Sequence, residues 1–341
     1  MVQTLSTLGE NNLLRSEFSS LQGQIQQLQT QIATTQKTQV YGDLGAQAAP
    51  DISLRQQADV VNDFQNTISQ LQVRTGLVDT SLGIINATAL AVKNSAFQTP
   101  SFPEQRADLV NAAKSAIDQI TQQLQTTVDG RNLYGGTQTQ GAVTTPSSTL
   151  LPAVQAAVNT ALNAVPPPAN VPAAIQAAVA GVFSSAAAYY TGGPPYPPTQ
   201  IDQGLTLNDS ITAADPSFQA ILTGLYTLAA LPQPSGQTAT LPNISEPQFD
   251  AVAQAAASQI SGGLSQLQIV TERNGRNQSL LTSESNTHNA TLTILQTQID
   301  NIEEVNLADA STRITQLKTQ LDASFHVTAD LSGLSLVDLL K

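Results

Sequence analysis

An unbroken heptad pattern near the N-terminus constrains the fold of this chain more than any other feature. Apolar residues recur there at spacings that alternate between four and three, at Leu14, Phe18, Leu21, Ile25, Leu28 and Ile32. The residues between them are almost all polar, so the pattern predicts a helix over about residues 10–38 with one narrow apolar stripe, the N-terminal seam. A single helix about 43 Å long cannot bury such a stripe by itself, and it therefore needs partner helices along its length.

Two further helices follow in the first third of the chain. The same alternation predicts a second helix over about residues 53–95, after an interval in which Pro50 interrupts the pattern. A Pro-containing loop ends this helix. The spacing of Ser101 and Glu104 is that of a capping box, which predicts a third helix from this point to about Val128.

The C-terminal third returns to the same period. One helix is predicted over about residues 249–304, and another begins after Asn306. Because both ends of the chain carry seams of similar length, we expect them to pair in antiparallel fashion, with identical neighbours covering what remains exposed. The second of these stripes, the C-terminal seam, consists of Ile314, Leu317, Leu321 and Phe325, with Leu336 and Leu340 in the apolar end that follows.

The middle of the chain has a different character. Proline-rich runs at 166–168 and 194–198 cannot lie inside helices. We interpret this zone as a small inserted domain of mixed structure, and a flexible Pro/Ala linker is the alternative. The elements expected in it are Ala-rich helical pieces at about 152–164 and 172–190, a helix near 216–231 and a strand-like stretch at 201–211.

Together these patterns predict a mainly α chain: an elongated rod of long antiparallel helices with a terminal coiled coil, a small inserted α+β domain and a short β-hairpin. The expected segments are an N-terminal coiled coil (1–45), the N-terminal half of a helical rod (46–140), a variable inserted outer domain (141–248), the C-terminal half of the rod (249–304) and a C-terminal coiled coil (305–341).

Composition excludes several classes of function. Charged residues make up 11% of the chain, against about 25% in ordinary domains, and aromatic residues make up 4%. The net charge of −12 and the scattered basic residues argue against nucleic acid as a partner. The absence of cysteine removes disulfides and thiolate metal sites. We expect no cleaved signal peptide and no membrane insertion, because no stretch resembles a signal sequence or a bilayer span.

The candidates for chemistry are few. His288 falls on an apolar stripe and fits a core or interface position, while His326 stands near the C-terminus without a credible set of metal ligands. Glu303, Glu304 and Asp309 could support acid–base catalysis, but without an aromatic pocket they fit an exposed helix end. We therefore expect no catalytic residue, no cofactor, no metal site and no enzymatic activity.

Two groups of short motifs carry a resemblance to a known family. The segment Asp129–Thr139, with Gly130, Arg131, Leu133 and Tyr134, resembles the "G-R-Y-L-F-A-G" segment at which flagellins and hook-filament junction proteins leave their N-terminal helices. Gly130 is expected to stop the third helix, and Leu133 and Tyr134 to enter a strand, with close backbone approach at Gly135–Gly136. The C-terminal motifs are "G-x-R-x-N" around Arg276, the helix break at 302–310, and the ending at 320–325 and 334–340.

The resemblance is to the bacterial flagellin family, and most of all to hook-filament junction proteins of the third hook-associated type. It implies an extracellular flagellar protein that is exported without a cleaved signal and assembles with copies of itself in a tube. The partners it implies are other hook-associated proteins, flagellin and an export chaperone. The N-terminus reads Gln3-Thr4-Leu5-Ser6 in place of the flagellin "I-N-T-N" opening, which favours a junction protein. A filament-forming flagellin is one alternative, and a secreted adhesin or type III tip-like protein is another.

Overall fold

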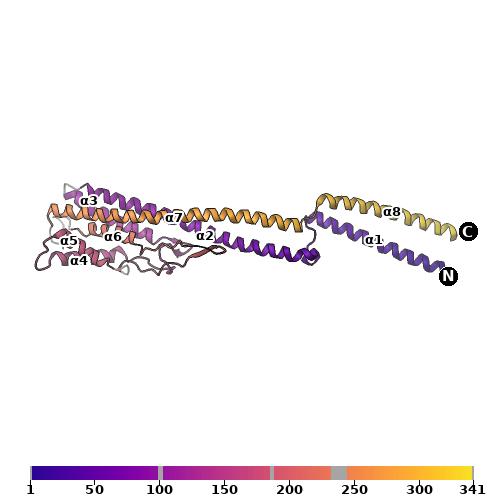
Figure 1. Ribbon diagram of the computed structural model, residues 1–341, viewed down its shortest axis with the longest axis horizontal. Coiled ribbons are helices and arrows are strands. Elements are labelled where there is room, and N and C mark those ends of the chain that lie inside the picture. The colour runs from indigo at the N-terminus through magenta and orange to yellow at the C-terminus, as the bar shows by residue number, and fades with distance from the viewer. Residues whose placement is uncertain (1, 99–102, 185–187, 232–243, 340–341) are drawn as a thin grey trace. The chain divides into compact units, whose positions relative to one another are not determined.

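The computed structural model describes residues 2–98, 103–184, 188–231 and 244–339, and the chain is mainly helical there, as predicted (Figure 1). Two short antiparallel hairpins, β1–β2 and β3–β4, complete the described part. The helices are α1 (Val2–Thr34), the 3-10 helix η1 (Tyr41–Gln47), α2 (Ala48–Phe97), α3 (Pro103–Leu124), α4 (Ser147–Leu162), α5 (Val171–Val182), α6 (Pro216–Ala229), α7 (Glu246–Glu303) and α8 (Leu307–Leu339). The strands are β1 (Thr127–Val128), β2 (Arg131–Asn132), β3 (Thr199–Asp202) and β4 (Leu205–Leu207).

The chain divides into two compact units. Unit 1 comprises residues 1–62 and 289–341, and unit 2 comprises residues 63–288. The boundary falls within the long helices α2 and α7, so each of these helices contributes residues to both units. The five segments expected from the sequence have other boundaries than these units and remain a prediction.

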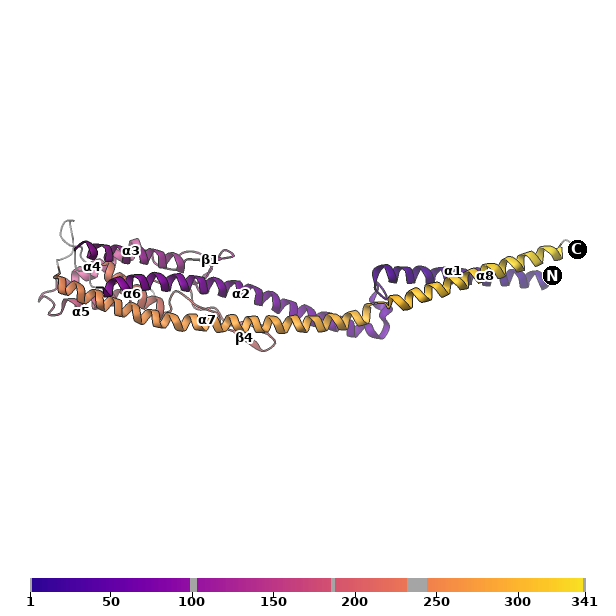
Figure 2. The same cartoon turned by 90° about the horizontal axis from the view of Figure 1, so that it is seen from above.

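Unit 1 contains the two terminal helices. In Figures 1 and 2, α1 and α8 run side by side in opposite directions, with the two chain ends at the same end of the pair. The ring of Phe18 on α1 stacks on that of Phe325 on α8, with centroids 4.6 Å apart and planes 22° apart. α1 ends at Thr34, earlier than predicted, because Thr35 takes a left-handed conformation with a φ of 60°.

The predicted break between the two C-terminal helices is confirmed, since α7 ends at Glu303 and α8 begins at Leu307. Lys37, just after α1, closes the end of α7. Its Nζ donates to the carbonyl oxygens of Asn301 and Ile302 at 2.9 and 2.7 Å, and its backbone N–H donates to that of Glu303 at 2.7 Å. The last carbonyls of a helix have no donor within the helix, so these bonds satisfy groups that would otherwise need water.

The predicted start of α2 and the predicted end of α3 were also wrong. α2 begins at Ala48 rather than near residue 53, with Pro50 inside its first turn. Proline is tolerated there because the N–H that it lacks has no acceptor in the first turn of a helix. α3 ends at Leu124 rather than near Val128, because Val128 belongs to strand β1 instead.

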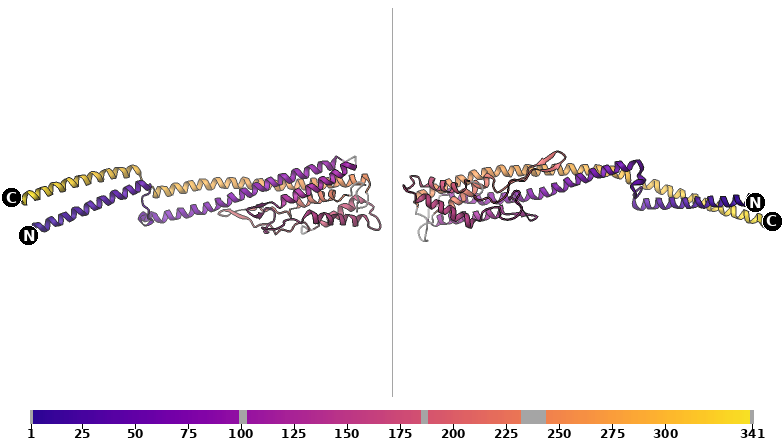
Figure 3. Two further views of the ribbon diagram at one scale, coloured as in Figure 1. Left: turned by 180° about the vertical axis from the view of Figure 1, so that it is seen from behind. Right: turned by 90° about the horizontal axis from the view of Figure 1, so that it is seen from below.

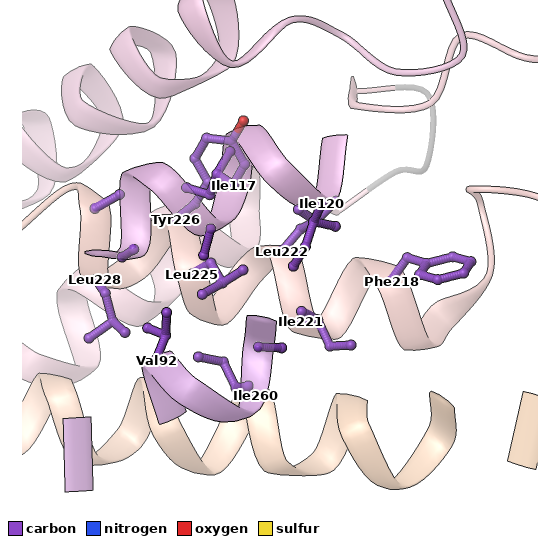
Figure 4. Packing of buried hydrophobic residues seen from close by; sticks show 14 of the residues in the cluster. Val92, Ile117, Ile120, Phe218, Ile221, Leu222, Leu225, Tyr226, Leu228 and Ile260 are labelled. Carbon is purple, nitrogen blue, oxygen red and sulfur yellow. The ribbon is translucent and has the colours of Figure 1, made fainter. Parts of the chain in front are cut away.

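Unit 2 has one large apolar core to which helices from distant parts of the sequence contribute. Figure 4 shows side chains of α2, α3, α6 and α7 converging on it. α6 is buried on nearly all of its faces, as expected for a short helix that is apolar all round. The labelled members of this core are Val92 from α2, Ile117 and Ile120 from α3, Phe218, Ile221, Leu222, Leu225, Tyr226 and Leu228 from α6, and Ile260 from α7.

The middle of the chain packs into the same core. α4 and α5 contact each other, and α5 also contacts α6. α4 and α5 lie along one side of the long helices of unit 2 (Figure 3). Val154 and Val158 of α4 and Val179 of α5 are fully buried in the large core. The Pro- and Gly-rich runs thus connect elements of a folded region.

The expected strand over residues 201–211 is wrong, because the chain reverses within it. β3 and β4 form an antiparallel hairpin in which Asp202 is paired with Leu205, and Gly204 in the turn has a φ of 85°. The hairpin covers a second, smaller apolar cluster between α2 and α7. Its buried members are Ile68, Leu71, Ile201, Leu207 and Leu281.

One segment, Tyr41–Phe97, is long and apolar enough by length and composition to cross a membrane. Its apolar residues in unit 2, such as Val78, Leu82 and Ile85, are at most 3% exposed and belong to the large core. Packing in unit 2 therefore accounts for part of this hydropathy, while Val73 and Ile84 of the same helix remain exposed, at 58% and 42%.

The contact between α6 and α7 depends on two glycines. A Cβ atom at Gly224 would lie 2.6 Å from Cγ1 of Ile260 and 2.9 Å from the carbonyl oxygen of Ala256. A Cβ atom at Gly263 would lie 2.7 Å from Cγ1 of Ile221. Both helices therefore approach more closely than any residue with a side chain would permit at these two positions.

We predict that Gly224→Ala lowers the free energy of unfolding by about 1–3 kcal/mol, because the added methyl group must displace the α7 backbone. Gly262→Ala is the matched control, since a Cβ atom there meets nothing within 4 Å. It should be neutral or stabilise the protein by up to about 1 kcal/mol through helix propensity. Chemical denaturation followed by circular dichroism measures both. A Gly224→Ala protein as stable as the wild type would contradict the close contact.

Candidate assembly surface

The structure leaves most of the N-terminal seam partly open. Ile25 is buried, at 9% exposure, and the other five seam residues on α1 are half-buried. On α8, Ile314, Leu317 and Leu321 are also half-buried, and Phe325 is 51% exposed despite its stack on Phe18. Leu340 and the side chain of Leu336 lie outside the described residues. The two seams thus face each other, but one helix does not cover the other.

In unit 2, by contrast, neighbouring helices bury the apolar residues of the same heptad pattern. Ile68, Leu82 and Ile85 on α2 continue the heptad alternation and are 0% exposed. They are covered because α7 and, further along, α3 and α6 surround α2 there. A strict a/d seam can be closed by one partner in a two-stranded coiled coil, whereas a wider apolar stripe needs more helices. In unit 1, α8 leaves the α1 seam half-buried, and in unit 2 the additional helices close the seam of α2.

Further large apolar side chains are exposed on the terminal helices. Leu13 on α1 is 64% exposed and Val327 on α8 is 54% exposed. Each lies next to its seam in sequence but about 100° or more around its helix from the centre of the seam, so they add apolar positions outside a and d. We define the α1/α8 surface as the two seams together with these two residues. It has the character of a surface that binds another apolar surface.

The acidic residues at the α7–α8 break have structural partners. Glu303 forms an ion pair with Arg55, which also contacts Asp51 at 3.3 Å. The hydrogen bond that Arg55 donates to Glu303 is the main cause that raises the pKa of Arg55. Asp309 forms an exposed ion pair with Arg313 one turn later, at 3.0 Å. These contacts fit a role in holding the helix ends rather than in acid–base chemistry.

Asn306 begins α8. Its Oδ1 accepts hydrogen bonds from the backbone N–H groups of Ala308 and Asp309, each at 3.1 Å. This is the contact made by an N-cap residue, and it satisfies two of the four N–H groups that a helix start leaves unpaired. The motif at 302–310 therefore contains both the end of one helix and the start of the next.

The first family-like motif forms a hairpin and a buried anchor. Asp129 and Gly130 occupy the turn between β1 and β2 with φ values of 50° and 73°. Gly130 thus turns a hairpin and does not stop α3, and Leu133 and Tyr134 follow the strand rather than begin one. Both of these side chains are buried, at 2% and 0% exposure, in the large core of unit 2.

The environment of Tyr134 shows how firmly this segment is held. Its ring packs edge-on against Phe218 of α6, with centroids 5.7 Å apart. Burial raises the pKa of its hydroxyl to about 12. The neighbouring Arg131 is exposed and lies over the ring of Tyr196, 6.0 Å from its centroid. The motif therefore anchors the start of the middle region in the core.

The close approach expected at Gly135–Gly136 is confirmed. A Cβ atom at Gly136, which has a φ of 58°, would lie 2.3 Å from the carbonyl oxygen of Pro194 and 2.4 Å from that of Gly193. Thr137 N–H donates to the Pro194 carbonyl at 2.9 Å. The motif thus packs against the Gly- and Pro-rich run at 192–198, a contact between segments that are distant in sequence.

In the second family-like motif, residues 274–277, the buried contact is made by Asn274 and not by Arg276. Arg276 is exposed on α7. Asn274, two positions earlier, is 1% exposed, and its Nδ2 donates to the carbonyl oxygen of Thr75 on α2 at 2.9 Å. Gln278 donates to the same carbonyl at 3.0 Å. A polar residue at a helix position that should be apolar was the available signal for this contact.

The two histidines are placed very differently. His288 is 3% exposed, as the core assignment from the sequence required, and His326 on α8 is exposed. The ring of His288 stacks on Phe64, with centroids 5.9 Å and planes 14° apart. Its Nε2 lies 3.0 Å from the carbonyl oxygen of Ile201.

Comparison with known proteins identifies the C-terminal third. The family model for the bacterial flagellin C-terminal helical region matches residues 253–340. Among solved structures, a protein from Vibrio parahaemolyticus provisionally assigned as a flagellar hook-associated protein has a similar fold, with a TM-score of 0.53 and 13% sequence identity. The match covers 75% of this chain and 97% of that one. No curated protein sequence matches. The chain is therefore flagellin-like: residues 253–340 are similar to the C-terminal helical region of bacterial flagellins, and the fold is similar to that of the Vibrio protein.

Proposed function

We propose that this chain is a structural subunit of the bacterial flagellum that links the hook to the filament, and that it assembles through the α1/α8 surface. The observation that carries the proposal is the half-buried state of both seams, within a chain whose residues 253–340 match the flagellin C-terminal helical region. A structural subunit that assembles through such a surface needs no catalytic or cofactor-binding residues.

Self-assembly supplies what the terminal helices lack. Copies arranged around a tube bring further helices against α1 and α8, and each copy then covers the open sides of its neighbours' seams. Burial of apolar surface contributes roughly 25 cal/mol per Å², so the gain accumulates along the length of both helices. Few charges line these helices, which lowers the repulsion between identical copies.

The junction role is favoured over a role as the main filament subunit by two observations. The similar fold belongs to a protein provisionally assigned as hook-associated, and the N-terminal opening at residues 3–6 differs from that of flagellins. A filament-forming flagellin is the second candidate, because the matching family model is that of flagellin itself.

The remaining features of the proposal come from the family. The protein is exported through the flagellar type III channel without a cleaved signal and functions outside the cell. Its partners are other copies of itself, further hook-associated proteins and flagellin, and an export chaperone that holds the C-terminal helix before assembly.

Imaging of flagella from a strain that lacks this chain tests the junction role. Intact hooks without filaments, with flagellin released into the medium, are expected for the loss of a junction protein. Loss of the filament with no released subunit, together with thousands of copies per filament in sheared wild-type flagella, would instead establish the chain as the flagellin. Unchanged flagella and motility would overturn both assignments.

We predict that Leu21→Ala combined with Leu28→Ala weakens assembly far more than it destabilises the free chain. Both residues are half-buried in the free chain, so truncation there costs less than the roughly 2–5 kcal/mol of a fully buried leucine. In an assembly that buries them, each substitution should reach that range. The measurements are denaturation of the purified protein and complementation of motility in the deletion strain.

The matched control is Gln22→Ala combined with Gln29→Ala, which has the same spacing of seven residues on exposed positions of α1. It should assemble like the wild type. Equal effects of the two pairs on motility, or normal assembly of the leucine variant, would show that the N-terminal seam does not carry the contact.

A further inference from the structure

A cluster of potential metal ligands lies in unit 2, apart from the α1/α8 surface. Asp202 ends strand β3, while Glu284 and His288 lie one turn apart on α7. One ring nitrogen of His288 and one carboxylate oxygen from each acidic residue lie within 4.8 Å of one another. The cluster joins the β3–β4 hairpin to the helix that it covers.

The two carboxylates lack the cationic partners of Asp209 and Asp250, and one oxygen of Asp202 accepts the backbone N–H of Gln203 at 2.7 Å. Asp209 is paired with Arg74 at 3.4 Å, and Asp250 with Arg106 at 3.9 Å. Among the described residues, no ion pair within 4.0 Å involves Asp202, Glu284 or His288. Two half-buried negative charges at one place repel each other, and a cation bound between them would remove that cost.

The histidine is held in the manner of a metal ligand. A neutral imidazole that donates Nε2–H to the Ile201 carbonyl, 3.0 Å away, carries its lone pair on Nδ1. Metal-binding histidines commonly donate their second N–H to a backbone carbonyl in this way, which fixes both the tautomer and the ring orientation. The stack on Phe64 holds the ring from its face.

A neighbouring buried oxygen also lacks a donor. Gln65 follows Phe64, and its Nε2 donates to the Oγ of Ser285 on the same part of α7, at 2.7 Å. Its Oε1 is buried without a hydrogen-bond partner among the described residues.

We propose that Asp202, Glu284 and His288 bind a Zn²⁺ ion that fastens the β3–β4 hairpin to α7. One imidazole nitrogen and two carboxylate oxygens are ligands that Zn²⁺ accepts, and the imidazole disfavours Mg²⁺ and Ca²⁺. Zinc–ligand bonds of about 2.0–2.2 Å place ligand atoms about 3.3–3.6 Å apart, so the partly exposed carboxylates draw inward on binding. The hairpin cluster around Ile201 and Leu207 is small, and a metal link adds to its stability.

Zinc titration of the metal-stripped full-length protein by calorimetry tests the proposal. The expected result is one Zn²⁺ per chain and a rise in the thermal unfolding midpoint. Glu284→Gln keeps the size of a partly exposed side chain and removes its charge. It should weaken binding by about 10-fold or more, since even loss of an outer partner of a metal ligand often costs 10- to 100-fold.

His326→Gln is the matched control, because it removes the other histidine of the chain, which is exposed on α8. It should bind zinc like the wild type. His288→Gln should abolish binding, and circular dichroism checks that this buried substitution leaves the helices intact. Absence of stoichiometric binding, binding unaffected by Glu284→Gln, or binding lost in His326→Gln would each overturn the proposal.

Discussion

The number of helices available to cover an apolar stripe governs this structure. One partner helix can close a strict a/d seam in a two-stranded coiled coil, but a wider apolar stripe needs three or four helices. In unit 2, α2 and α7 are joined by α3 and α6, and residues such as Leu82 and Ile260 are fully buried. In the described part of unit 1, α8 is the helix that packs along α1, and the α1 seam stays half-buried.

Unit 2 has the contacts of a self-sufficient fold. Its helices approach closely enough to require glycine at Gly224 and Gly263, and Tyr134 anchors the start of the middle region in the same core. Unit 1 instead has helix ends that are well closed, by Lys37 on α7 and Asn306 on α8, next to seams that are not. This contrast fits a subunit in which one part is stable alone and the other is completed by neighbouring copies.

The helices could be predicted from the sequence because their stripes repeat over many turns. The seams, the break after Glu303 and the burial of His288 all follow from the position of apolar residues at a period near 3.6. Helix boundaries were predicted wrongly at proline and glycine, because each of these residues is compatible with more than one local structure. Pro50 was read as a break but lies in a first turn, and Gly130 was read as a helix stop but turns a hairpin.

Contacts between distant segments could not be predicted. Asp202 lies 82 positions before Glu284 in the sequence, so the ligand cluster appears only after the β3–β4 hairpin folds onto α7. For the same reason the sequence pointed to Arg276, whereas the structure uses Asn274 to hold the Thr75 carbonyl. The burial of α4 and α5 in the core of unit 2 likewise depends on tertiary packing that no local pattern reports.

The central claim is that neighbouring copies cover the α1/α8 surface, and the most direct test is the accessibility of that surface before and after assembly. The chain has no cysteine, so Val327→Cys provides a single labelling site on α8, and Ala153→Cys on the exposed side of α4 provides a control. Maleimide should label both sites in the isolated protein. In purified flagella, the site at 327 should be protected and the site at 153 should remain reactive. Equal labelling of position 327 in the isolated and assembled protein would contradict the account.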